Sequence, residues 1–167
     1  MNLLTHLTLA LLLTLLIYAN LNMDPKTLNL CLIAAALGSL IPDLDHPKAF
    51  LSRRHWTLQG TSRLIEIAFH HRGITHSLLM LIATTGIGIL ALNKLQMNAN
   101  LAIPYAIGYL SHLLADSFNP MGVKLFQPIS QWTFKTKTKI QTGGITDRIL
   151  GVTLGAIFLI LYAGINA

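Results

Sequence analysis

Charged residues are scarce in this chain, and the scarcity excludes most kinds of soluble protein. They make up 11% of the 167 residues, whereas hydrophobic residues make up 53%. Soluble domains carry about 25% charged residues, so an ordinary soluble domain is excluded. Cysteine is almost absent as well. Because Cys31 is the single cysteine, no intramolecular disulfide can form, and we expect it to pack within an apolar helix.

Basic residues are missing before the first apolar run, and this argues against a cleaved signal peptide. The segment that follows the run, Tyr18-Ala19-Asn20, is also a poor cleavage site for a signal peptidase. We therefore expect a permanent first helix.

Five apolar runs predict an all-α, polytopic membrane protein of about five short helices, forming a single membrane-embedded domain over residues 1–167. A helix needs about 20 residues to cross a bilayer, and about 17 at the lower end, so these runs are short spans. The runs at 28–41 and 101–115 are the ones whose full crossing is uncertain. The five runs cover residues 3–19, 28–41, 77–92, 101–115 and 149–165.

The positions of the basic residues predict the orientation in the membrane. The net charge of +6 is not gathered on an aromatic-interleaved face, so we expect no direct binding to nucleic acid. By the positive-inside rule, the N-terminus and both large loops are expected to be cytoplasmic. The loop after the second run carries Lys48, Arg53, Arg54, Arg63 and Arg72, and the loop after the fourth carries Lys124, Lys135, Lys137, Lys139 and Arg148.

Both loops also contain segments suited to the membrane surface. Tryptophan beside cationic residues at 53–56 predicts an interfacial connector over residues 48–70. Alternating basic and polar residues at 132–139 predict an extended segment attracted to anionic lipid head groups. In the third run, Thr84, Thr85, Gly86 and Gly88 are small residues of the kind that permits close helix packing in lipid.

Three polar segments at the ends of apolar runs carry candidate metal ligands. Asp43, Asp45 and His46 lie in a turn between two prolines, where the alternative to metal binding is an Asx-type turn with a helix cap, although such a turn needs only one of the two carboxylates. His71 and His76 flank Gly73, and interfacial anchoring would explain them equally well. His112 and Asp116 are four residues apart and share one helix face, which also suits a plain histidine–aspartate hydrogen bond.

Two further residues at the same membrane face are weaker candidates for metal ligands. His6 lies near the start of the first helix, where an interfacial side chain is more common than a ligand. Asp147 precedes the last apolar run, and we expect it to cap that helix rather than bind a metal.

The predicted topology brings all of these groups to the cytoplasmic ends of their helices. Such a donor set exceeds the needs of one four-coordinate zinc, so we expect two ions, or one ion with acid–base groups. Zinc is the favoured divalent metal, with manganese as the other option. The expected ligand set is His6, Asp43, Asp45, His46, His71, His76, His112 and Asp116.

Three segments resemble the YdjM-like bacterial inner-membrane proteins, a family described as membrane-bound, metal-dependent hydrolases and also as LexA-binding. They are Pro42-Asp43-Leu44-Asp45-His46-Pro47-Lys48, His71-Arg72-Gly73-Ile74-Thr75-His76-Ser77 and Gly108-Tyr109-Leu110-Ser111-His112-Leu113-Leu114-Ala115-Asp116. The resemblance implies the bacterial inner membrane as the location. It selects His71 rather than His70 as a site residue, and the family usually has glutamate where this chain has Asp147.

These observations predict a membrane-bound, metal-dependent hydrolase that acts on a phosphoester, such as a phosphorylated lipid, at the cytoplasmic membrane surface. The catalytic residues would be Arg72, which could clamp a phosphate, and Asp45, with water activated by the metal as the nucleophile. The alternative is a membrane scaffold that binds a cytoplasmic regulatory protein and contains a structural metal. An ion transporter fits less well, because its acids should lie at the bilayer midplane.

Overall fold

The computed structural model describes residues 1–21, 23–45 and 74–165. The regular secondary structure in this part of the chain is helical, apart from an isolated β-bridge within the irregular connection over residues 118–144. The helices agree closely with the five predicted runs, so the all-α prediction is confirmed for the described residues. The α-helices are α1 (Leu3–Tyr18), α2 (Pro25–Leu40), α5 (Leu78–Lys94), α6 (Ala102–Ser117) and α7 (Ile145–Ile165). Short 3₁₀ turns are η1 (Ala19–Leu21), η2 (Ile41–Asp45), η3 (Ile74–His76) and η4 (Ala99–Leu101). The predicted interfacial connector at 48–70 lies outside the described residues.

Side-chain caps fix where three of the helices begin. Asn2 caps α1 by accepting from the backbone N–H of Thr5, and Asp24 caps α2 in the same way, with Pro25 as the first helical residue. The hydrogen bonds from Thr27 hold the pKa of the Asp24 carboxyl below its usual value. Ser77 caps α5, so His76 lies immediately before that helix starts.

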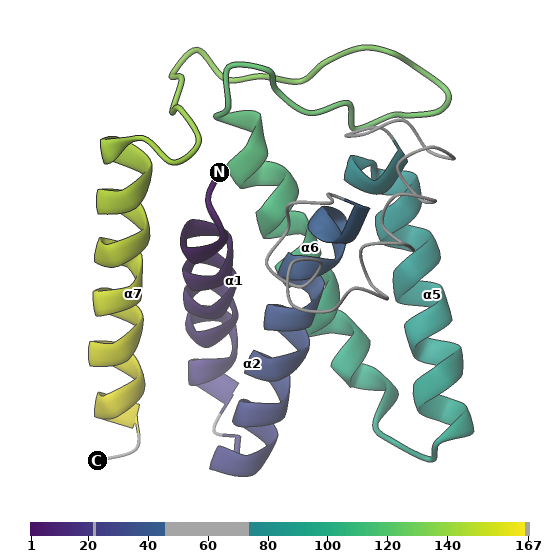
Figure 1. Cartoon of the computed structure of the whole chain (residues 1–167). Coiled ribbons are helices and arrows are strands. Elements are labelled where there is room, and N and C mark those ends of the chain that lie inside the picture. Colours follow the sequence, from purple (N-terminus) through teal and green to yellow (C-terminus); the bar gives the residue numbers. More distant parts are fainter. Residues whose placement is uncertain (22, 46–73, 166–167) are drawn as a thin grey trace, which may run out of the picture.

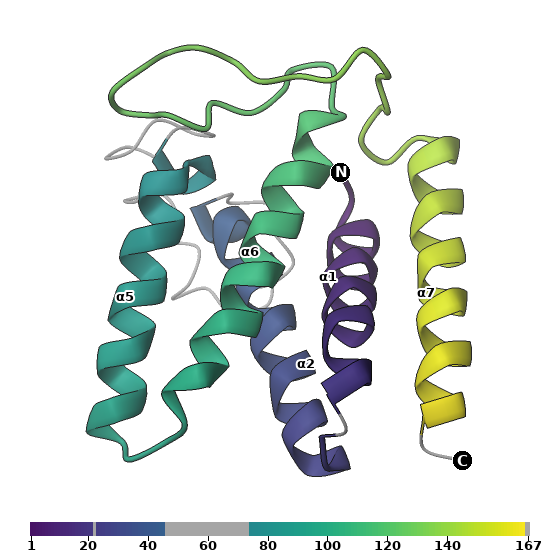
Figure 2. The ribbon, with the colours of Figure 1, turned by 180° about the vertical axis from the view of Figure 1, so that it is seen from behind.

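The helices lie side by side, and the long connection between α6 and α7 runs across one end of them (Figures 1 and 2). α2 packs against α6, while α1 contacts α2, α6 and α7. The N-terminus, the start of α5, the end of α6 and the start of α7 all lie at the end that this connection crosses. The fold therefore brings together segments far apart in the sequence.

Backbone hydrogen bonds hold the connection over residues 118–144 against the helix ends. Val123 and Phe134 form an antiparallel bridge, so the predicted extended segment at 132–139 begins in extended pairing. Thr136 donates to the carbonyl of Ser117, and Leu78 donates to the carbonyl of Leu125. These bonds satisfy backbone groups that a helix end leaves free, and they tie the connection to α5 and α6.

Two glycines allow α2 and α6 to cross with their backbones in direct contact. A Cβ atom on Gly38 would lie 2.0 Å from the carbonyl oxygen of Tyr105, and one on Gly108 would lie 1.9 Å from that of Ala35. Close packing was also expected at Thr84, Thr85, Gly86 and Gly88. For the two glycines the expectation is wrong within the described residues, because a Cβ atom on Gly86 or Gly88 would meet no atom within 4 Å. Small residues support close packing only where a partner helix approaches.

Among the described residues, two helices are long and apolar enough to cross a membrane by themselves. They are the stretch Pro25–Asp43, in which η2 continues α2, and α7. The run at 28–41, one of the two doubtful spans, is thus extended at both ends, while α1 and α5 are apolar but shorter. The outer faces of α5 and α7 carry exposed side chains such as Leu90 and Ile160, both 71% accessible. Apolar outer faces suit a lipid environment, and crossing by all five helices stays a prediction.

Replacing Gly108 with alanine should destabilise the protein, because the new methyl group would overlap the backbone of Ala35. Overpacking of this kind costs at least about 1–3 kcal/mol. Thermal melting of the purified protein in detergent measures the effect. Gly86→Ala is the matched control, since its methyl group enters open space, and equal melting temperatures for the two variants would contradict the packing described here.

Candidate metal centre

Five of the eight predicted ligands converge where four segments of the chain meet. His6 comes from α1, Asp43 from η2, His76 from η3, and His112 and Asp116 from α6. The three histidines are almost completely buried and Asp116 is buried too, whereas the Asp43 side chain is 38% accessible. The cluster is therefore enclosed by helices and opens to solvent on the side of Asp43.

One backbone hydrogen bond fixes the orientation and tautomer of His112. Its Nδ1 lies 2.7 Å from the carbonyl oxygen of Ser39 in α2. Since a carbonyl can only accept, Nδ1 carries the hydrogen and the lone pair of the neutral ring is on Nε2. Metal-binding histidines commonly donate their second ring nitrogen to a carbonyl in this manner. The arrangement turns Nε2 toward both carboxylates of the cluster.

Two ring nitrogens that face the centre, Nε2 of His76 and Nε2 of His112, lack hydrogen-bond partners among the described residues. Nε2 of His112 lies 3.8 Å from Asp43 Oδ1 and 3.8 Å from Asp116 Oδ2, and Nε2 of His76 lies 3.6 Å from each of the same oxygens. Both nitrogens are buried, and neither makes a hydrogen bond with the part of the chain that the structure describes. A buried polar atom without a partner is costly, so this geometry calls for a proton or a cation between the rings and the carboxylates.

The separations suit donors that share one ion. Zinc binds nitrogen and oxygen at about 2.0–2.2 Å, so tetrahedral ligands lie about 3.4 Å from one another. The spacing of 3.6–3.8 Å in the cluster is only slightly larger. The described residues contain two sets of possible metal ligands, and His112 belongs to both. Because only its Nε2 is free, His112 can bind one ion at a time, which favours one centre among these donors.

His6 lies at the edge of this centre. Its ring stacks on His112 with centroids 3.8 Å apart, and its Nε2 lies 3.3 Å from Asp116 Oδ1. The same carboxylate oxygen contacts the amino group of Met1, so Asp116 has one oxygen toward α1 and the other toward the centre. His6 also forms a possible ligand set with Asp43 and His112.

The segment before α5 holds His76 in place through a neighbouring helix. Tyr109 in α6 donates a hydrogen bond from its hydroxyl to the backbone carbonyl of Thr75. The hydroxyl of Thr75 in turn lies 3.1 Å from Nδ1 of His76. Neither Ser39 nor Tyr109 had been assigned a role from the sequence, because a backbone carbonyl or a distant hydroxyl donor leaves no local sequence signal.

The remaining predicted site residues are not placed by the structure. His46, His71 and Arg72 lie outside the described residues, and only the backbone of Asp45 is described. Their proposed roles stay predictions.

Asp147 takes part in a different contact, close to the cap expected for it. Its carboxylate accepts hydrogen bonds from the backbone of Gly143, the backbone of Asn2 and the hydroxyl of Thr5. The bond from Gly143 satisfies a free N–H before α7, as in a capping box. The other two bind the start of α7 to the start of α1, so this buried acid braces the helices.

Comparison with known proteins decides the family. The YdjM inner membrane protein family matches residues 1–167, the whole chain. The chain belongs to this family. It is 39% identical over 128 residues to inner membrane protein YdjM of Escherichia coli and to that of Shigella flexneri. These alignments cover 72% of the chain and 61% of each relative, so the chain spans less than two thirds of their length.

A more distant relative is the uncharacterized protein YvsG of Bacillus subtilis, 29% identical over 127 residues, covering 75% of this chain and 74% of that protein. No solved structure matches the chain. Family membership, together with the apolar helices, identifies a membrane protein.

We expect this family member to contain one tightly held divalent ion at the described donors when it is purified without chelators. Removing the His112 imidazole should lower the metal content at least about tenfold, because the ring supplies a buried, pre-oriented nitrogen. Elemental analysis of wild type and His112→Ala measures this. Well-folded wild-type protein without bound metal would refute the expectation.

Asp147→Asn tests whether Asp147 stabilises the fold or binds the metal. The amide cannot accept all three hydrogen bonds, so one or more donors would be left unpaired at a cost of about 1–3 kcal/mol. We expect a lower melting temperature with unchanged metal content per folded molecule. Loss of metal from a folded variant would instead place Asp147 among the ligands.

Proposed function

We propose that this YdjM-family protein is a metal-dependent hydrolase that acts on a phosphoester at the cytoplasmic surface of the bacterial inner membrane. The observation that carries the proposal is the pair of buried Nε2 atoms on His76 and His112, which have no hydrogen-bond partner among the described residues and face two carboxylates at 3.6–3.8 Å. Histidine and carboxylate donors at such spacing suit zinc or manganese.

The donors divide into a fixed part and an accessible part. His76, His112 and Asp116 are buried and would hold the ion, with His112 oriented by Ser39 and His76 by Thr75. Asp43, which is 38% accessible, lies where a substrate could approach. A divalent ion bound here would supply Lewis-acid activation of the phosphoester and of the attacking water. Arg72 and Asp45 keep their proposed catalytic roles, Arg72 as a phosphate clamp.

The charge distribution supports a cytoplasmic orientation of the centre. The connection between α6 and α7 contains Lys124, Lys135, Lys137 and Lys139, and it lies at the end where the donors converge (Figure 1). At the other end, the described basic residues are Lys26 and Lys94. By the positive-inside rule, the lysine-rich end faces the cytoplasm, and with it the N-terminus.

A second function is favoured by the same set of donors. Three histidines and two carboxylates are enough to saturate a tetrahedral zinc, and a closed site of that kind is structural rather than catalytic. In that case the metal would hold α1, α2 and α6 together, and the basic connection would bind a cytoplasmic regulatory protein. The accessibility of Asp43 is the observation that favours the hydrolase.

Asp43→Asn tests the two functions against each other, because the amide keeps the shape of the side chain and removes its charge. Purified protein is assayed for release of phosphate or alcohol from phosphomonoesters, phosphodiesters and phospholipids. The hydrolase predicts turnover that falls more than about 100-fold in the variant, since even partners outside the metal's own ligands contribute about 10–100-fold.

Asp147→Asn is the control, because it is a buried acid outside the cluster, and its activity per folded molecule should match wild type. If metal-loaded wild-type protein turns over none of these substrates and Asp43→Asn only lowers the melting temperature, the scaffold is correct.

A further inference from the structure

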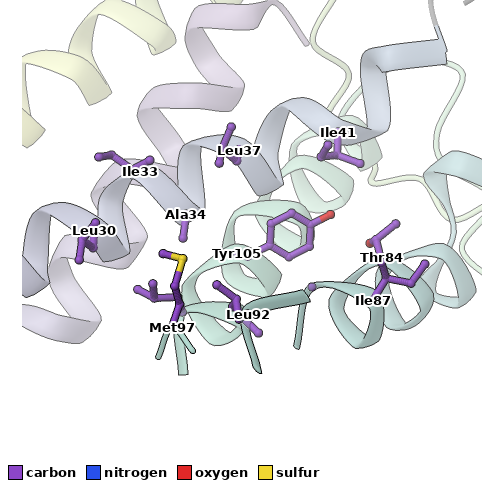
Figure 3. Close-up of a pocket in the computed structure, with 13 residues that line it drawn as sticks. Leu30, Ile33, Ala34, Leu37, Ile41, Thr84, Ile87, Leu92, Met97 and Tyr105 are labelled. Carbon is purple, nitrogen blue, oxygen red and sulfur yellow. The ribbon is translucent and has the colours of Figure 1, made fainter. Parts of the chain in front are cut away.

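An apolar groove of about 460 Å³ lies between α2 and α5, with α6 beneath it (Figure 3). Its volume falls within the range of about 300–1,000 Å³ typical of ligand sites. Most of its lining is aliphatic, and Thr84 and Tyr105 contribute the hydroxyl groups. Side chains from α2, including Leu30, Ile33 and Leu37, form one long wall.

The groove exists because α5 stands away from α2. The crossing of α2 and α6 is closed at Gly38 and Gly108, where the backbones touch. On α5, in contrast, no residue is buried, and a Cβ atom on Gly88, which lines the groove, would meet nothing within 4 Å. Helix packing in the described residues thus leaves an apolar surface between these elements without a protein partner.

The two ends of the groove differ in chemistry. At one end lies Ile41, two residues before Asp43 of the His/Asp cluster, and this is the end toward which Thr84 lies (Figure 3). Toward the other end lie Leu92 and Met97 (Figure 3), and Leu101 of η4 also lines the groove, so these residues offer only hydrocarbon and a thioether. A ligand that fills the groove therefore needs an apolar tail, and a polar group attached to that tail would lie beyond the Ile41 end, near the His/Asp cluster.

Charge complementarity identifies the polar group as anionic. The four lysines of the 118–144 connection lie at the same end of the helices as the cluster. Lysines near a membrane surface attract anionic headgroups. An apolar groove whose Ile41 end lies toward the lysine-rich end of the helices matches a membrane lipid that carries a phosphate.

We propose that this groove binds one acyl chain of an anionic phospholipid whose phosphate-bearing headgroup lies at the His/Asp cluster. The position of the headgroup rests on the proposed function, and makes the substrate class of the hydrolase a phospholipid. The acyl-chain site rests on the groove alone. The lipid enters sideways from the bilayer, because both walls of the groove are helices with apolar outer faces.

Photocrosslinking with a matched pair of glycine variants tests the proposal. The full chain in detergent is irradiated with a phosphatidylglycerol that carries a diazirine near the end of one acyl chain, and adducts are located by mass spectrometry. Wild type should be labelled around Leu92, Met97 and Leu101. Gly88→Leu places a side chain in the groove and should reduce labelling there at least about tenfold, equivalent to about 1.4 kcal/mol.

Gly86→Leu adds the same side chain to the same helix, at a position that also has open space but does not line the groove, and its labelling should equal wild type. Unlabelled phosphatidylglycerol should compete, and diacylglycerol, which has no phosphate, should compete at least about tenfold less well. Equal labelling of both variants, equal competition by diacylglycerol, or adducts that lie only outside the groove would each overturn the proposal.

The acyl-chain site and the hydrolase can fail independently, and the experiments distinguish the two failures. Groove labelling that depends on Gly88, in a protein that contains no metal and hydrolyses nothing, would support the acyl-chain site and refute the hydrolase. Turnover of a water-soluble phosphoester by both glycine variants, with labelling that does not differ between them, would support the hydrolase and refute the lipid site.

Discussion

The hydrogen bond from His112 to the carbonyl of Ser39 is the contact on which the rest of the centre depends. It joins α6 to α2 across the crossing at Gly38 and Gly108, where the backbones are close enough for a side chain to reach a main-chain oxygen. The carbonyl is available because it lies in the last turn of α2, where carbonyls lack partners within the helix. A wider crossing would lose the bond, and with it the direction of Nε2.

Because the donors of the cluster are largely buried, the stability of the protein should depend on whether a metal ion is bound among them. Two carboxylates and three imidazoles inside a helical membrane protein are expensive to desolvate, and polar groups in such positions are usually retained for function. A cation at the centre would offset much of that cost, because its charge is opposite to that of the two carboxylates. The link between metal and fold is therefore expected to be strong, as in other proteins whose site is assembled from separate helices.

Most of the fold and part of the site could be predicted from the sequence. The apolar runs located the helices because hydrophobicity is a local signal, and basic residues indicated which helix ends meet. His112 and Asp116 were paired correctly because their spacing on one helix face needs no tertiary information. The role of Ser39 could not be predicted, since any residue has a carbonyl. The close packing expected at Gly86 and Gly88 failed because composition does not reveal which helix a small residue will face.

The brace formed by Asp147 bears on how the protein is made. Its partner Thr5 lies 142 residues earlier in the chain, so the two can meet only after Asp147 has been synthesised. Until α7 is in place, the start of α1 lacks this anchor, although the Met1 amino group contacts Asp116 and the His6 ring stacks on His112. A translation product that ends before α7 would contain all five described donors but not the brace, so its first helix would be held less firmly.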